Sequence, residues 1–115
     1  MAYGRYLGYS SGGGVITQIT NKSTGVTLST ICGQITTHNA SLSNGVEVGF
    51  TVTNTLVAAT DVIIASIASA TANSYALTVD AVGAGSYHLS LSNLSAAPLA
   101  EALVINVAVI KAVAS

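Results

Sequence analysis

Residues 75–92 read Tyr-Ala-Leu-Thr-Val-Asp-Ala-Val-Gly-Ala-Gly-Ser-Tyr-His-Leu-Ser-Leu-Ser, and this stretch decides the class of fold. Apolar and polar side chains alternate on both sides of the Gly-Ala-Gly at 83–85, which is the period of a half-buried strand. A three-residue loop with glycine where a positive φ is needed commonly closes a β-hairpin. The stretch therefore predicts two antiparallel strands, 75–82 and 86–92.

The register of this hairpin assigns each side chain to a face of the sheet. The three-residue loop pairs Val82 with Ser86. Asp80 then falls directly opposite His88 on the polar face, where a salt bridge or a subunit contact is expected rather than an acid–base dyad. The opposite face is predicted to hold the apolar residues: Tyr75, Leu77, Val79, Ala81, Tyr87, Leu89 and Leu91.

Further β-branched runs flank the hairpin, separated by segments rich in Gly, Asn and Ser or by a turn around Pro98. The expected strands are 15–20, 26–30, 33–37, 46–53, 61–68, 75–82, 86–92 and 102–113. About seven or eight short strands at this spacing predict an all-β fold. We expect residues 15–115 to form a single-domain antiparallel β-sandwich or a jelly-roll-like barrel.

Residues 1–14 differ from the rest of the chain and predict an extended arm. Tyrosines alternate with Gly, Arg and Leu, and three glycines follow at 12–14. One interpretation is a disordered tail. The other is an arm that orders on a partner through Tyr3, Arg5, Tyr6 and Tyr9, because Tyr and Arg often anchor interfaces.

Charged residues are scarce. Three basic and four acidic residues make up 6% of the 115, against about 25% in ordinary soluble domains. A net charge of −1 gives no basic field for nucleic acid and no cluster for anionic lipids. No apolar run is long enough to span a membrane. A surface with so little charge points to a chain largely covered by other protein.

The sequence offers no constellation for catalysis, a cofactor or a metal, so we expect no enzyme. Cys32 is the only cysteine and is expected to be a small buried residue. His38 and His88 lack the further ligands that a metal would need. No signal peptide is apparent, and synthesis in a cytoplasm is the simplest expectation.

Two segments, 62–68 and 102–113, have almost no polar face. Either both are central core strands, or a neighbouring subunit covers one of their faces. For the second alternative the expected subunit contacts are Ile63, Val104, Ile105, Val107 and Val109, together with Asp80 and His88.

Several stretches carry a family resemblance. Residues 93–95 read Asn-Leu-Ser, and 99–111 read Leu-Ala-Glu-Ala-Leu-Val-Ile-Asn-Val-Ala-Val-Ile-Lys. Gly-Val-Ile-Thr-Gln at 14–18, Thr-Gly-Val-Thr-Leu at 24–28 and Gly-Gln-Ile-Thr at 33–36 accompany them. Over roughly residues 14–112 the chain resembles small β-rich virion proteins encoded in tailed-phage and prophage structural gene clusters.

This resemblance implies a structural role and carries no catalytic residues. It predicts a capsid decoration (cement) protein on the virion surface, a homotrimer bound to the major capsid protein after synthesis in the host cytoplasm. A tail or fibre module is the alternative within the same class. A carbohydrate-binding receptor module is the alternative from another class, although the chain has no Trp and only two tyrosines in the domain.

Overall fold

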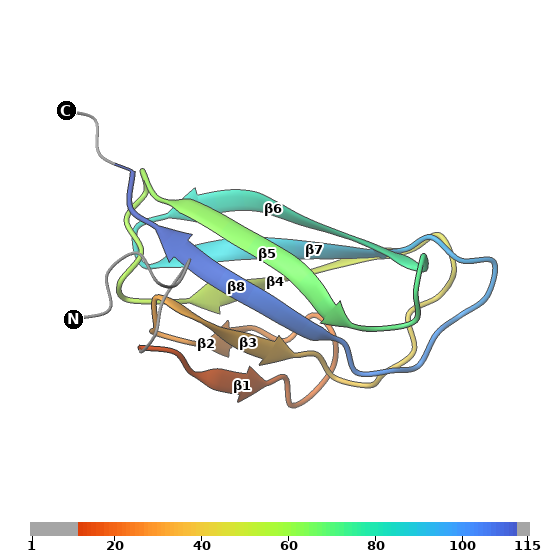
Figure 1. Cartoon of the computed structure of the whole chain (residues 1–115). Helices are drawn as coiled ribbons and strands as arrows, with labels where there is room; N and C mark the ends of the chain where they lie inside the picture. The colour runs from red at the N-terminus through yellow and green to blue at the C-terminus, as the bar shows by residue number, and fades with distance from the viewer. Residues whose placement is uncertain (1–11, 113–115) are drawn as a thin grey trace, which may run out of the picture.

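The computed structural model describes residues 12–112 and folds them into a two-sheet β-sandwich (Figure 1). The predicted all-β sandwich is confirmed, and no helix occurs within this range. The strands are β1 (Val15–Thr17), β2 (Val26–Thr27), β3 (Cys32–Thr36), β4 (Glu47–Thr53), β5 (Val62–Ser69), β6 (Tyr75–Gly83), β7 (Ser86–Asn93) and β8 (Val104–Ile110). The predicted arm residues Tyr3, Arg5, Tyr6 and Tyr9 lie outside the described residues.

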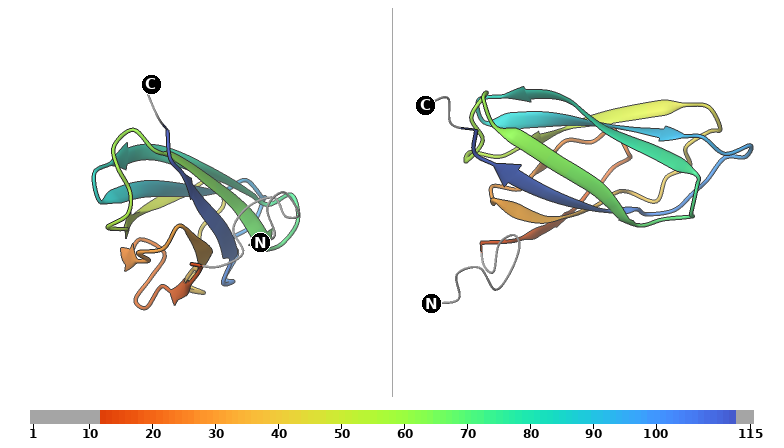
Figure 2. Two further views of the ribbon diagram at one scale, coloured as in Figure 1. Left: turned by 60° about the vertical axis from the view of Figure 1, so that its left-hand side comes forward. Right: turned by 45° about the horizontal axis from the view of Figure 1, so that its top comes forward.

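The two sheets contain four strands each and pack face to face. Sheet A has the order β1-β3-β8-β5, and sheet B has the order β2-β4-β7-β6. In Figure 1, β5 and β8 lie in front of β6 and β7, and the turned views of Figure 2 show the same two layers. The sheets do not join into a closed barrel, so the barrel alternative is wrong.

Both sheets are mixed, and the expectation of purely antiparallel pairing is wrong at two edges. β1 pairs with β3 in parallel, and β2 pairs with β4 in parallel. The reason is the chain path: β1 and β2 belong to different sheets, so β3 and β4 each return beside an earlier strand after a crossover. A crossover brings the chain back in the same direction, whereas a hairpin reverses it.

The inward faces of both sheets share the hydrophobic core. Its larger cluster contains Val26, Leu28, Ile35, Phe50, Val52, Val57, Ile63, Tyr87, Leu89, Ile105, Val107 and Val109, and a smaller one contains Leu42, Leu91 and Leu103. Tyr87 is 2% exposed, and its hydroxyl has no hydrogen-bond partner among the described residues. Burial raises the pKa of Tyr87 to about 12.

The β6–β7 hairpin departs from its predicted register near the turn. Gly83 pairs with Ser86, which leaves a two-residue loop with Gly85 at φ +85°. A bulge at Asp80 then absorbs one residue, so that the pairing of Val79 with Leu89 is as predicted.

The bulge changes which side chains reach the core on the turn side of Asp80. Val82 packs against the core, whereas Ala81 is exposed, so the predicted placement of Ala81 on the apolar face is wrong. Alternation in sequence cannot reveal this inversion, because a bulge inserts one residue without breaking the pattern of residue types.

A buried lysine ties three loops together at one end of the sandwich. The Nζ of Lys22, a residue 4% exposed, donates hydrogen bonds to the backbone carbonyls of His38, Ala40 (2.8 Å) and Glu101 (2.7 Å). The Gln18 side chain donates to the carbonyl of Lys22 and accepts from the N–H of His38. Burial lowers the pKa of Lys22, and the charge of Glu101 acts in the opposite direction.

Buried asparagines hold further loops in place. Asn93 is fully buried, and its Nδ2 donates to the carbonyls of Leu42 (2.8 Å) and Ala97 (3.0 Å). At the opposite end, Asn54 donates to the carbonyl of Thr30 at 2.7 Å. Because a buried polar group costs little only when it is hydrogen-bonded, these side chains favour one arrangement of the loops.

Replacing Lys22 by Met should destabilise the protein by about 2–4 kcal/mol, because three partly buried carbonyls lose a charged donor. Urea unfolding measures the change. Thr78→Met is the control and should cost far less, since Thr78 is an exposed residue of β6. We call the three hydrogen bonds of the Lys22 ammonium group the Lys22 clamp. A Lys22→Met protein as stable as the control variant would contradict a stabilising role of this clamp.

Replacing Tyr87 by Phe should leave the stability unchanged or raise it by up to about 1 kcal/mol, because the substitution removes a buried hydroxyl without a partner. The midpoint of thermal unfolding reports the change. A clear loss of stability would show that the hydroxyl is hydrogen-bonded in solution.

Candidate functional site

The outer face of sheet A is an uncharged surface. β5 and β8 pair antiparallel, and the side chains of each strand point alternately to the core and to the outside. The residues between the core positions therefore all point outward. The most exposed apolar side chains of β5 and β8 are Val62 (49%), Ile64 (51%) and Ile110 (43%). We call these three residues the apolar patch. Val15 of β1, at the other edge of the sheet, is 77% exposed. The remaining outward residues of β3, β5 and β8 are also uncharged: Cys32, Gln34, Thr36, Ser66, Ala68, Val104, Asn106 and Ala108.

Four of the predicted subunit contacts do not lie on this surface. Their side chains fill the protein's own core, so as contact residues they were wrong: Ile63, Ile105, Val107 and Val109. The pleat explains the error, since their neighbours in sequence point the other way. Val104 is half-buried on the outward side, and Cys32, expected in the core, is half-buried there as well.

β5 is an edge strand, so it is not one of two central core strands. It pairs only with β8, while β8 lies between β3 and β5. Proteins usually protect such an edge with Lys, Pro, a bulge or a covering segment. β5 contains no charge and no Pro over eight residues, and its one irregularity lies between Ile67 and Ser69. The patch therefore adjoins a sheet edge that the strand itself hardly protects.

One ion pair marks the rim of the apolar patch. Asp61 directly precedes β5, and Lys111 directly follows β8. The Oδ2 atom of Asp61 and the Nζ atom of Lys111 are 2.6 Å apart. The N–H of Ala58 donates to Asp61 at 2.8 Å, and Lys111 donates to the carbonyl of Leu56 at 2.6 Å. These contacts lower the pKa of Asp61. The hydrogen bond from Ala58 has the largest effect, and the hydrogen bond from Lys111 has the next largest. The loop at residues 56–61 therefore hydrogen-bonds to both the Asp61 carboxylate and the Lys111 ammonium group.

The outer face of sheet B is polar and carries a second cluster. His88 Nδ1 lies 2.6 Å from Asp80 Oδ1, so the predicted Asp80–His88 contact is confirmed. The predicted pairing is wrong, because His88 pairs with Ala81 and Asp80 occupies the bulge. Ser90 Oγ donates to Asp80 Oδ2 at 2.7 Å. The imidazole lies over Gly49, where a Cβ would clash with His88 Cε1. Hydrogen bonds from His88 and Ser90 lower the pKa of Asp80, and the one from His88 has the larger effect.

This cluster contains Ser, His and Asp, but not in the arrangement of a hydrolase triad. Nucleophilic catalysis requires the serine to give its proton to the histidine. Ser90 instead donates to Asp80, and it is only 5% exposed. Among residues 12–112, no hydroxyl or thiol is hydrogen-bonded to a histidine ring, and no group of three or more His, Cys, Asp or Glu is placed to hold a metal.

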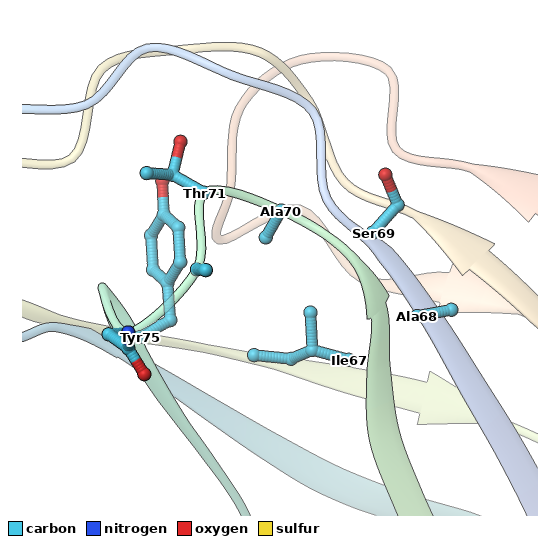
Figure 3. A pocket seen from close by; sticks show the side chains of 8 residues that line it. Ile67, Ala68, Ser69, Ala70, Thr71 and Tyr75 are labelled. Atoms are coloured by element: carbon cyan, nitrogen blue, oxygen red, sulfur yellow. The ribbon is translucent and has the colours of Figure 1, made fainter.

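A shallow hollow lies at the β5–β6 connection (Figure 3). It has a volume of about 250 Å³ and is lined by residues 67–73 and Tyr75. The Tyr75 hydroxyl and Thr71 donate to the carboxylate of Glu101. These bonds lower the pKa of Glu101, and burial followed by the Glu101 contact raises the pKa of Tyr75 to about 12. The polar groups beside the hollow thus bind one another, which favours a structural role.

Two features were not predicted from the sequence: the apolar patch on the outer face of sheet A and the Lys22 clamp at one end of the sandwich. The apolar patch could have been found, because alternation around core residues assigns Val62, Ile64 and Ile110 to one face. The Lys22 clamp left no such signal, because its acceptors are backbone carbonyls from distant segments.

The fold and its surfaces define an all-β sandwich with one uncharged and one polar outer face. No family model, curated protein or solved structure matches the chain. In the part of the chain that the structure describes, no helix has the length and hydropathy to cross a membrane.

The Asp80 contacts predict a pH dependence. Because the folded protein lowers the pKa of Asp80 below its ordinary 3.8, these contacts stabilise the fold above that pH and lose their effect as the pH falls through the lowered value. Asp80→Asn should therefore lose less stability than the wild type between pH 5 and about 2. Glu47→Gln, on the same face, serves as control. Parallel acid-unfolding curves for wild type and Asp80→Asn would contradict the assignment.

Proposed function

We propose that the protein is a virion structural protein, a capsid decoration (cement) protein that binds the outer shell of a phage as a homotrimer. The observation that carries this proposal is the uncharged outer face of sheet A, with its apolar patch and the poorly protected edge of β5. The resemblance of the sequence to tailed-phage virion proteins supports the same class.

An uncharged face suits contact between sister subunits. Burying it desolvates no ionised side chain, which is the costly part of many interfaces. Each Å² of apolar surface removed from water contributes about 25 cal/mol. Val62, Ile64 and Ile110 are each 43–51% exposed and so retain area to bury. Repetition of the contact over many shell sites would add avidity.

The proposed mechanism is mechanical. A decoration protein must hold its shape while it ties shell subunits together. The Lys22 clamp and the buried Asn54 and Asn93 fix the loops at both ends of the sandwich. The proposed anchors to the major capsid protein are Tyr3, Arg5, Tyr6 and Tyr9 of the arm, in a groove or at a sheet edge.

The alternatives differ in what they need from the surface. A tail or fibre module could use the same uncharged face, so only its position on the particle distinguishes it. A carbohydrate-binding module would need exposed aromatic rings. Of the aromatic residues within 12–112, Phe50 and Tyr87 are buried and Tyr75 is bound to Glu101. This distribution gives the sugar-binding alternative little support.

Replacing Ile64 by Lys should lower the affinity of the protein for phage heads at least about tenfold, because a charge would enter the subunit contact. The heads used are ones that do not already carry the protein. Thr78→Lys is the matched control, since Thr78 is an exposed β6 residue of sheet B. Titration of purified variants onto such heads, followed by cryo-EM, measures occupancy and symmetry.

The expected density is three-fold symmetric on the outer shell, with sheet A facing sister subunits. Density on the tail alone would favour the tail or fibre module. Wild-type protein that leaves no density anywhere on the particle would overturn the proposal, as would full occupancy by Ile64→Lys.

A further inference from the structure

A closed trimer needs two different contact surfaces on each protomer. A two-fold dimer pairs one surface with itself, whereas in a ring each protomer contacts its two neighbours through different surfaces. The apolar patch at the β5 edge of sheet A is one such surface. The proposed trimer therefore requires a second surface that matches it.

The opposite edge of sheet A offers this second surface. β1 is the other edge strand, and Figure 1 shows β3 and β8 lying between β1 and β5. Val15 of β1 and Ile19, two residues beyond the end of β1, are each 77% exposed, more than any other large apolar side chain in the described range. We call these two residues the β1 patch.

The two edges are compatible in direction and nearly level. β1 is parallel to β3, and both β3 and β5 are antiparallel to β8, so β1 and β5 run the same way. Rotation about an axis along the strands therefore brings β5 of one protomer beside β1 of the next in parallel. Through the paired rows Val15 stands level with Ser66, one outward position along β5 from Ile64. A tilt of the strands to the axis, which ring closure commonly involves, makes up this offset.

The distribution of charge favours a sister protomer as the occupant of both patches. Residues 15–19 and 62–69 contain no charge, and Asp61 and Lys111 beside the apolar patch neutralise each other. A charged partner surface would lose its hydration here without gaining an opposite charge. A two-fold contact of the apolar patch with itself would leave the β1 patch in water, whereas a ring buries both patches of every protomer.

We propose that the trimer is a ring in which the apolar patch of each protomer packs against the β1 patch of the next, with Ile64 against Val15. This inference rests on the proposed function and specifies its subunit contact. The neighbour's β1 also covers the edge of β5, which the strand itself hardly protects.

Charge substitutions test this contact through the mass of the purified protein in sedimentation equilibrium. The wild type should have about three times the 11.4 kDa mass of one chain. Val15→Glu and Ile64→Lys should each abolish the trimer, because each places an unpaired charge in the contact. Val46→Glu is the matched control and should leave the trimer intact, since Val46 is 44% exposed and directly precedes β4 of sheet B.

Combining Val15→Glu with Ile64→Lys in one chain should restore the trimer at low salt, because the new carboxylate of one protomer meets the new ammonium group of the next. A two-fold contact gives no such rescue, since it opposes like charges at position 64. A monomeric or dimeric wild type, a single variant that stays trimeric, or a double variant without rescue would overturn the proposed contact.

Binding to phage heads separates this contact from the decoration function. A wild type that is not a trimer in solution but fills three-fold sites on heads would overturn the contact and leave the decoration function standing. A rescued trimer that never binds heads would confirm the contact and overturn the decoration function alone.

Discussion

The two-residue period of β5 and β8 is the constraint on which the rest of the structure depends. A strand presents alternate residues to opposite faces, so placing Ile63, Ile105 and Val107 in the core leaves their neighbours outside. In most sandwiches those neighbours are polar. Here they are aliphatic or small, and the position of β5 at a sheet edge leaves them uncovered by the described chain. The core and the proposed contact face are two sides of the same strands.

The charged side chains of the described residues lie off that face, with the Asp61–Lys111 ion pair at its rim. Lys22 and Asn93 bind backbone carbonyls at loop ends, and Asp61 with Lys111 holds the loop beside β5. Asp80 and His88 lie on the opposite sheet. This separation lets a chain with very few charges keep a defined fold while one whole surface is free of them.

Much of this fold could be predicted from the sequence, but its exceptions could not. Alternation gave the strands and the two faces of the hairpin, and the Asp80–His88 contact followed from it. The bulge at Asp80 and the parallel edge pairs depend on turn geometry and on the chain path, which residue types do not encode. The site was predicted less well: uniformly apolar segments hid the alternation that buries Val107 and exposes Ile64.

The Lys22 clamp also determines how the protein responds to heat. The hydration of an ammonium group becomes less favourable as temperature rises, so the cost of keeping Lys22 away from water shrinks. Its hydrogen bonds join carbonyls from two segments, residues 38–40 and residue 101, to the loop that carries Lys22. The loops at this corner should therefore be among the last parts of the molecule to open on warming, after the weakly held strand edges.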